Sequence, residues 1–239
     1  MISLSRRELL VSLLALPAAL PAQDDWIPLF DGRTLRGWKA GGLEDSWRVV
    51  DGQIAADGPR SHLYYAGRIR NASFKNFELK ADVLARPGAN SGIYFHTAYQ
   101  PNDWPKKGFE VQINNTQKGD ANYTERRKTG SLYAVRNIYK ALVKDDVWFQ
   151  MHILVRGKQV QVRLNDTLVV DYVEPDPPIR EGDLAGRYLD RGTFALQCHD
   201  PKSKAFFRNI LVRPLADDLA ANVEPPVVDD GEPVSVPLP

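Results

Sequence analysis

Short runs that alternate apolar and polar residues fill most of the chain between residues 24 and 215. Alternation of this kind places successive side chains on opposite faces of a strand. Gly, Pro, Asn and Asp separate the runs, as expected for an all-β sandwich or barrel. The pattern predicts strands at residues 47–50, 74–84, 91–97, 109–114, 148–155, 159–164, 167–172, 193–198 and 205–212.

Turn residues between paired runs predict hairpins. Asp51-Gly52 and Asn165-Asp166 each separate two β-rich runs, and Arg156-Gly157-Lys158 forms a slightly longer connection. Asp, Asn and Gly tolerate the left-handed backbone that tight hairpin turns require. We therefore expect neighbouring runs to pair as antiparallel strands.

Several predicted strands are apolar on one face and carry amide, imidazole, carboxyl or phenol groups on the other. In residues 91–97, Ile93 and Phe95 oppose Tyr94 and His96. The same alternation places further polar residues on second faces: Glu110, Gln112, Asn114, Gln197, His199, Glu78, Lys80 and Asp82. If these strands are neighbours, the residues form one polar surface. A solvated outer face is the alternative, but such a face is usually rich in Lys, Thr and Ser.

Amides and carboxylates pair with sugar hydroxyls, and aromatic rings stack on sugar faces. This composition favours a sugar-binding groove. Eight segments occur along the chain in the following order: WIPLFDGRTLRGWKA, WRVVDGQI, FKNFELKADV, GANSGIYFH, GFEVQINN, TGSLYAV, VWFQMHILVRGKQVQVRLNDTLVVDY and GTFALQCHD…FFRNILVRPL. Together they resemble the 3-keto-disaccharide hydrolase family over about residues 26–215.

The resemblance implies a concanavalin A-like jelly roll, in which two antiparallel sheets form a concave sugar-binding face. It also implies bacterial, secreted or periplasmic proteins that act on glycosides oxidised at C3. Two departures lie near the expected groove. His96 stands where the family often has arginine, and the link from His199 to Phe206 is longer than usual.

A ketone at C3 acidifies the C2 proton, so elimination of the C1 substituent followed by addition of water cleaves the glycosidic bond. This route needs a base, an acid and a group that stabilises charge on the C3 oxygen. The sequence offers Glu110 and His199 as base or acid, with Gln112, His96 and Tyr94 to orient substrate or stabilise the enolate. GFEVQI carries a single central carboxylate, which disfavours the carboxylate pair of ordinary glycosidases.

Further substrate contacts are expected from Asn114, Gln197, Asp82, Tyr133, Lys140 and Trp104. A divalent cation shared by His96, His199 and Glu110 would polarise the C3 carbonyl, although their spacing is not that of a compact metal site. His62 and His152 are interpreted as structural or surface residues. A non-catalytic carbohydrate-binding module of the same fold, or a scaffold domain, remains an alternative to the enzyme.

The two ends of the chain differ from its middle. Arg6 and Arg7 precede an apolar run at residues 9–20, which predicts a signal peptide over residues 1–22 and export to the periplasm or beyond. The arginine pair favours a twin-arginine signal, and an ordinary secretory signal with two arginines is the alternative. Without residues 1–22, 31 − 2 = 29 basic and 30 − 1 = 29 acidic residues remain. This balance argues against a nucleic-acid partner. Residues 23–215 form the expected domain, and the proline-rich residues 216–239 an extended or disordered tail.

Overall fold

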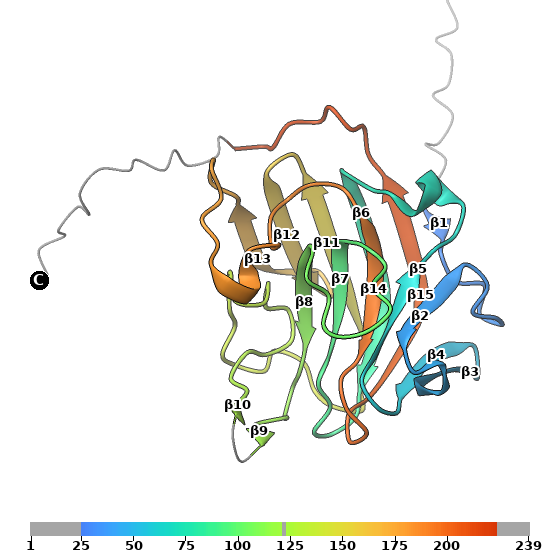
Figure 1. Cartoon of the computed structure of the whole chain (residues 1–239). Helices are drawn as coiled ribbons and strands as arrows, with labels where there is room; N and C mark the ends of the chain where they lie inside the picture. The colour runs from blue at the N-terminus through green and yellow to red at the C-terminus, as the bar shows by residue number, and fades with distance from the viewer. Residues whose placement is uncertain (1–24, 121–122, 224–239) are drawn as a thin grey trace, which may run out of the picture.

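Two antiparallel sheets pack face to face in the computed structural model, which describes residues 25–120 and 123–223 (Figure 1). The larger sheet has the order β13-β12-β11-β6-β15-β4-β3, with β1 paired to β15. The smaller sheet has the order β2-β5-β14-β7-β8. This arrangement confirms the predicted all-β, concanavalin A-like jelly-roll sandwich.

The strands of the larger sheet are β1 (Ile27–Pro28), β3 (Trp47–Val50), β4 (Gln53–Asp57), β6 (Phe77–Ala85), β11 (Phe149–Arg156), β12 (Gln159–Leu164), β13 (Thr167–Val173) and β15 (Lys204–Pro214). Those of the smaller sheet are β2 (Trp38–Gly42), β5 (Ser61–Tyr65), β7 (Ser91–Thr97), β8 (Phe109–Ile113) and β14 (Thr193–Cys198). A separate pair consists of β9 (Gly119–Asp120) and β10 (Tyr123–Thr124), and single 3-10 turns occur at η1 (Glu44–Ser46), η2 (Ile69–Ala72) and η3 (Gly182–Leu184).

Every predicted run corresponds to a strand, and the predicted hairpins form. Asp51 and Gly52 both adopt positive φ, 49° and 77°, between β3 and β4, and Asn165 adopts 52° between β12 and β13. Several short strands escaped prediction, among them β2 and β5. Every residue of β5 is buried, so this strand lacks the apolar–polar contrast by which a half-buried strand is recognised.

The core lies between the two sheets. Phe95, Phe109 and Phe194 of the smaller sheet face Phe77 and Ile153 of the larger one, and each is at most 1% exposed. At roughly 1.5–3 kcal/mol for each fully buried large apolar side chain, this layer supplies the main favourable free energy of folding.

The second face of the smaller sheet is buried as well. Tyr94, Glu110, Gln112 and Gln197 lie on it, and none is more than 4% exposed. Segments that follow β7, β8 and β13 cross over this face (Figure 1). This burial rules out the alternative of a solvated outer face.

The strand β6 does not contribute to that face, which corrects one prediction. It lies in the larger sheet between β11 and β15, so its polar side chains point away from the smaller sheet. Glu78 accepts a hydrogen bond from His152 at 2.9 Å, and Asn209 donates to Asp82 at 2.7 Å. Alternation along a strand shows which side chains share a face but does not show in which sheet the strand lies.

The predicted signal peptide and residues 224–239 of the proline-rich tail lie outside the described residues. Residues at the start of the predicted tail contact the sandwich: Asn76 Nδ2 donates to the carbonyls of Ala216 and Leu219 at 2.8 and 3.1 Å, and Arg156 Nε donates to that of Ala220 at 2.6 Å. Within the part of the chain that the structure describes, no helix has the length and apolarity to cross a membrane.

Candidate functional site

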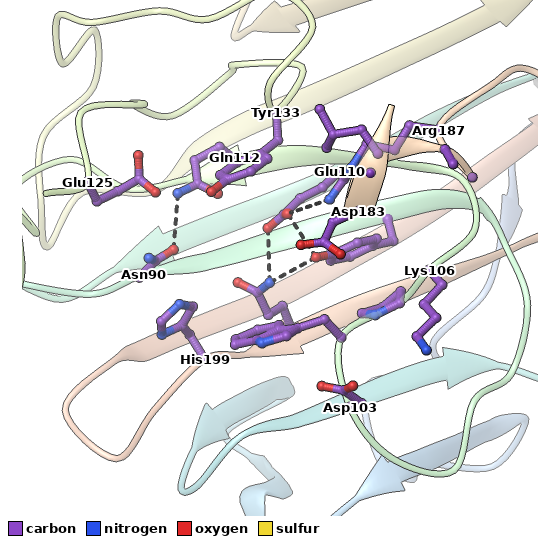
Figure 2. A pocket seen from close by; sticks show the side chains of 18 of the residues that line it. Asn90, Asp103, Lys106, Glu110, Gln112, Glu125, Tyr133, Asp183, Arg187 and His199 are labelled. Carbon is purple, nitrogen blue, oxygen red and sulfur yellow. Dashed lines mark hydrogen bonds and ion pairs between the residues drawn. The ribbon is translucent and has the colours of Figure 1, made fainter. Parts of the chain in front are cut away.

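A pocket of about 780 Å³ lies over the polar face of the smaller sheet (Figure 2). Its volume is within the range of roughly 300–1,000 Å³ that is typical of small-molecule sites. Side chains from β7, β8 and β14 form the floor, and the segments over residues 103–106, 123–133 and 182–187 form the walls. The lining includes Asn90, Tyr94, Trp104, Glu110, Gln112, Tyr133, Arg187, Gln197 and His199.

Glu110 is at the centre of a hydrogen-bond network on the floor. Tyr94 Oη donates to Glu110 Oε2 at 2.8 Å, and Gln197 Nε2 donates to Glu110 Oε1 at 2.9 Å and to Tyr94 Oη at 3.2 Å. These residues come from three adjacent strands, since β7 pairs with both β8 and β14. Register places Tyr94 directly opposite Glu110 and Ala195. Strand pairing therefore brings Tyr94 and Glu110 together, and Gln197 reaches both from the adjacent strand β14.

Burial makes Glu110 a stronger base than an ordinary carboxylate. Desolvation raises its pKa, while Arg187 and the hydrogen bond from Tyr94 lower it by less. Burial also raises the pKa of Tyr94, with the neighbouring Glu110 charge adding to the effect. Tyr94 therefore stays protonated and remains a donor to the carboxylate.

Arg187 brings a positive charge to the same point. Its Nη2 lies 3.9 Å from Glu110 Oε2, and its guanidinium lies 5.4 Å from the centre of the Tyr133 ring. Nη1 is buried and has no hydrogen-bond partner among the described residues. Figure 2 shows Arg187 and Glu110 on the same side of the pocket. A buried guanidinium with an unused donor is suited to an oxygen atom that gains negative charge.

The loop that carries Arg187 is anchored by a buried carboxylate. Glu174 accepts hydrogen bonds from the Leu189 amide at 2.9 and 3.0 Å, and Arg180 Nη2 lies 3.8 Å from it. Arg180 Nε in turn donates to the Arg187 carbonyl at 2.9 Å. Glu174 is fully buried, so these contacts hold the loop over the sheet firmly.

His199 and Asp200 form a hydrogen-bonded pair at the end of β14. His199 Nδ1 lies 2.8 Å from Asp200 Oδ2, and Ser203 Oγ donates to the same oxygen at 2.8 Å. Although burial opposes it, the hydrogen bonds from His199 and Ser203 hold the pKa of Asp200 below its ordinary value. An ionised Asp200 fixes a proton on Nδ1 and orients the ring. The Trp104 ring packs against this imidazole at 5.0 Å between centroids.

The end of the pocket away from Arg187 carries amides and a second carboxylate (Figure 2). Gln112 Nε2 donates to Asn90 Oδ1 at 3.1 Å, and Gln112 Oε1 is buried with no partner among the described residues. Glu125 accepts a hydrogen bond from Tyr123 and from the Arg127 amide. These groups offer acceptors and donors to ligand hydroxyls.

Most of the predicted site residues line this one pocket: Glu110, His199, Tyr94, Gln112, Gln197, Tyr133 and Trp104. The remaining four do not. Asp82 lies on the outer face of the larger sheet, and Lys140 is exposed in the segment between β8 and β11. Asn114 is buried beside the pocket, where its Nδ2 donates to the Arg127 carbonyl at 3.1 Å. These positions do not support substrate contacts by the three residues.

His96 is also absent from the pocket, because β7 is irregular there. The register between β7 and β14 shifts between Thr193 and Ala195, and His96 has a φ of 54°. An extra residue in a strand redirects side chains, and His96 packs against Phe77 instead. Its Nε2 donates to the Lys75 carbonyl at 2.8 Å and its Nδ1 accepts from the Asp190 amide at 3.2 Å. His96 thus holds the Arg187 loop, a positioning role in place of the predicted direct one.

The structure does not bring together the three metal ligands considered from the sequence, which were His96, His199 and Glu110. His96 uses both ring nitrogens on backbone groups, so it cannot join His199 and Glu110 around a cation. Across residues 25–120 and 123–223, no group of three or more His, Cys, Asp or Glu side chains is placed to hold a metal ion.

Arg187, Asp200 and Asn90 escaped the sequence analysis. Arg187 and Asn90 lie outside the alternating runs, in segments whose residues have no periodic pattern to interpret. His199 and Asp200 are consecutive in the sequence. An imidazole next to a carboxylate is a pattern that could have indicated an oriented histidine.

Comparison with known proteins agrees with this geometry. Residues 25–213 match the model of a family described as the 3-keto-alpha-glucoside-1,2-lyase-like domain. The chain belongs to this family. The match covers the whole sandwich and confirms the resemblance found in the sequence, and it makes the chain a member of a carbohydrate-acting family.

Individual relatives are more distant. A "3-keto-disaccharide hydrolase" of Bacteroides thetaiotaomicron is 34% identical over 100 residues, which cover 37% of this chain and 32% of that protein. The matched part is thus about a third of that relative's length. Two crystal structures of candidate glycosyl hydrolases from Parabacteroides distasonis share the fold, with TM-scores of 0.67 and 0.62 at 21% and 24% identity. They cover 82% and 80% of this chain and 99% of their own.

Proposed function

We propose that this protein cleaves glycosides whose sugar carries a ketone at C3, by proton abstraction at C2 and elimination of the C1 substituent. The observation that carries the proposal is Glu110, a buried carboxylate beside Arg187 on the floor of a sugar-sized pocket. Family membership and the name of the Bacteroides relative support the substrate class.

Glu110 acts as the base in this proposal. It takes the C2 proton, and the electron pair moves to form an enolate on the C3 oxygen. Arg187, with its unused buried Nη1, stabilises the negative charge that develops on that oxygen. Tyr94 and Gln197 hold the carboxylate in place by donating to its two oxygens.

His199 acts as the acid. As the enolate collapses, the bond from C1 to the leaving oxygen breaks, and that oxygen takes a proton from the imidazole. Asp200 stabilises the imidazolium before the transfer. Addition of water to the resulting enone places a hydroxyl on C1 and a proton on C2, so the net reaction is hydrolysis.

The test is turnover of a 3-keto-glucoside by purified protein, followed as release of the leaving group. We expect Glu110→Gln to lower kcat/KM by about 10²–10⁴-fold, the usual contribution of a general base. Asp82→Asn, on the outer face of the larger sheet, provides a matched carboxyl-to-amide control. Saturable binding of unoxidised sugars without product, by wild-type protein, would establish the carbohydrate-binding module instead.

We also propose that the protein is exported to the periplasm or beyond, on the evidence of residues 1–22. Replacement of Arg6 and Arg7 by lysine should leave the precursor in the cytoplasm of a bacterial host, if the signal is of twin-arginine type. Fractionation and immunoblotting measure the outcome. Unchanged export of the double variant would indicate an ordinary secretory signal.

A further inference from the structure

His62 is a buried histidine that the proposed reaction does not use. It lies on β5, directly opposite Gln197 of β14, and its side chain is on the polar face of the smaller sheet. The residue is 1% exposed. Neither ring nitrogen has a hydrogen-bond partner among the residues that the structure describes. Tyr64, two residues along the same strand, is equally buried, and its hydroxyl is also unpartnered within that part of the chain.

Such groups are rare in folded proteins because an unpaired buried donor or acceptor costs free energy of folding. Burial and the Arg60 charge lower the pKa of His62 to about 3, so the ring is neutral and presents one donor and one acceptor. The Tyr64 hydroxyl adds a donor and two acceptor lone pairs. Nothing in the packing of β5 against the core requires these polar atoms.

A single side chain separates His62 from the pocket. Trp104 packs edge-on against the His62 ring at 5.6 Å between centroids, and the same indole packs against His199 at 5.0 Å and lines the pocket. Tyr94, which belongs to the Glu110 network, forms another wall at 5.5 Å from His62. His62 is therefore next to the reaction site on the side of His199.

Gln100 Nε2 donates to the Trp104 carbonyl at 2.8 Å and holds the backbone of this residue, whereas the contacts that charged neighbours make with the indole side are weak. Arg60 Nη1 lies 3.5 Å from Asp103 Oδ1, with both side chains about half exposed (47% and 56%). The Arg60 guanidinium lies 5.0 Å from the indole. Exposed ion pairs and cation–π contacts of this kind contribute little to stability, so they oppose rotation of the indole only weakly while the Trp104 backbone stays in place.

We propose that His62 and Tyr64 form the floor of a second sugar compartment, which opens when the Trp104 side chain moves aside and which binds the leaving-group sugar of a disaccharide. The inference rests on the proposed function, because His199 as the acid places the leaving oxygen beside Trp104. A neutral imidazole and a phenol match the hydroxyls of an uncharged sugar, and the Trp104 and Tyr94 rings supply apolar walls.

The kinetic test compares two substrates that share the reacting ring, 3-keto-maltose and methyl 3-keto-α-glucoside. We expect His62→Leu to raise KM for the disaccharide by about tenfold and to leave KM for the methyl glycoside within about twofold. Because the imidazole makes no hydrogen bond to described residues, the variant should melt no lower than wild type. His152→Leu, on the outer face of the larger sheet, is the matched histidine control and should change neither KM.

A binding measurement separates this inference from the proposed reaction. The imidazole ¹⁵N signals of His62 are recorded in the Glu110→Gln protein, and we expect 3-keto-maltose to shift them and methyl 3-keto-α-glucoside to leave them in place. If wild type turns over both substrates but His62 is unchanged in both experiments, the compartment is refuted and the reaction stands. A His62 shift without turnover by wild type supports the compartment and refutes the reaction. If wild type does not turn over either substrate and the His62 signals do not shift, both the reaction and the compartment are refuted.

Discussion

At the scale of single residues, the environment of Glu110 determines how the activity should vary with pH. Burial raises the pKa of this carboxyl above its ordinary 4.5, and a base acts only when deprotonated. We expect kcat/KM to rise with pH through that raised pKa, at a higher pH than for an exposed carboxylate. A pH profile of kcat/KM measures it, and Asp82→Asn, on the outer face of the larger sheet, should retain the rising limb.

The same shift affects stability. Between 4.5 and the raised pKa, the folded chain keeps a proton on Glu110 that the unfolded chain has lost. The free energy of unfolding therefore falls as the pH rises through this window. Denaturant titrations of wild type and Glu110→Gln at several pH values should converge at low pH and separate as it rises, with wild type losing more. Parallel curves would show that Glu110 titrates like an exposed carboxyl.

The proposed role of His199 as the acid can be tested with substrates whose leaving groups differ in their need for a proton. We expect His199→Ala to lower kcat strongly for a 3-keto-disaccharide, by about 10²–10⁴-fold. A 3-keto-glycoside of nitrophenol should lose much less, because nitrophenolate departs without an acid. Asp200→Asn should show the same contrast more weakly, since Asp200 acts through the His199 ring. An equal loss on both substrates would place His199 in another role.

At the scale of elements, β7 shows both how far alternation predicts a site and where it fails. Tyr94 was correctly placed on the polar face, because the register of β7 against β8 is regular from Ser91 to Phe95. His96 was placed on the same face and does not lie there, because the register against β14 shifts. This one-residue register shift depends on how β7 pairs with a strand that is distant in the sequence. The local pattern of apolar and polar residues therefore does not predict it.

A glycine of β7 makes room for the proposed base. A Cβ at Gly92 would lie 2.5 Å from Glu110 Oε1, and the atoms in the way belong to that flexible side chain. We expect Gly92→Ala to fold normally and to displace the carboxylate, which lowers kcat by about 10²-fold, since a misplacement of about 1 Å has this effect.

Circular dichroism and thermal melting would confirm the fold of Gly92→Ala, and turnover would show the loss. Gly88→Ala is a control with open space around it, although its φ of 77° strains an alanine. A Gly92→Ala protein with full activity would show that the Glu110 side chain adapts without cost, which weakens its assignment as the base.

At the scale of the whole molecule, the sequence predicted the sandwich more completely than the site. Strand alternation and turn residues are local, and they were enough for the nine predicted strands and for Glu110, Gln112 and Gln197. The pocket walls come from long connections such as the one that carries Arg187, whose path depends on the buried anchors Glu174 and His96. Contacts between residues so far apart in the chain have no signature in a single sequence.

The division of the molecule into two sheets gives the last prediction. Asp82 and Glu110 are both carboxylates on β-strands, but Asp82 lies on the outer face of the larger sheet, where Asn209 donates to it at 2.7 Å and Arg208 lies 3.6 Å away. We expect Asp82→Asn to leave turnover within about twofold of wild type and to lower the free energy of unfolding by no more than about 1 kcal/mol, because partly exposed ion pairs contribute little. The comparison with Glu110→Gln uses the same substitution chemistry on opposite sides of the sandwich. A large loss of activity in Asp82→Asn would mean that the outer face takes part in the reaction, and the assignment of function to the smaller sheet alone would then fail.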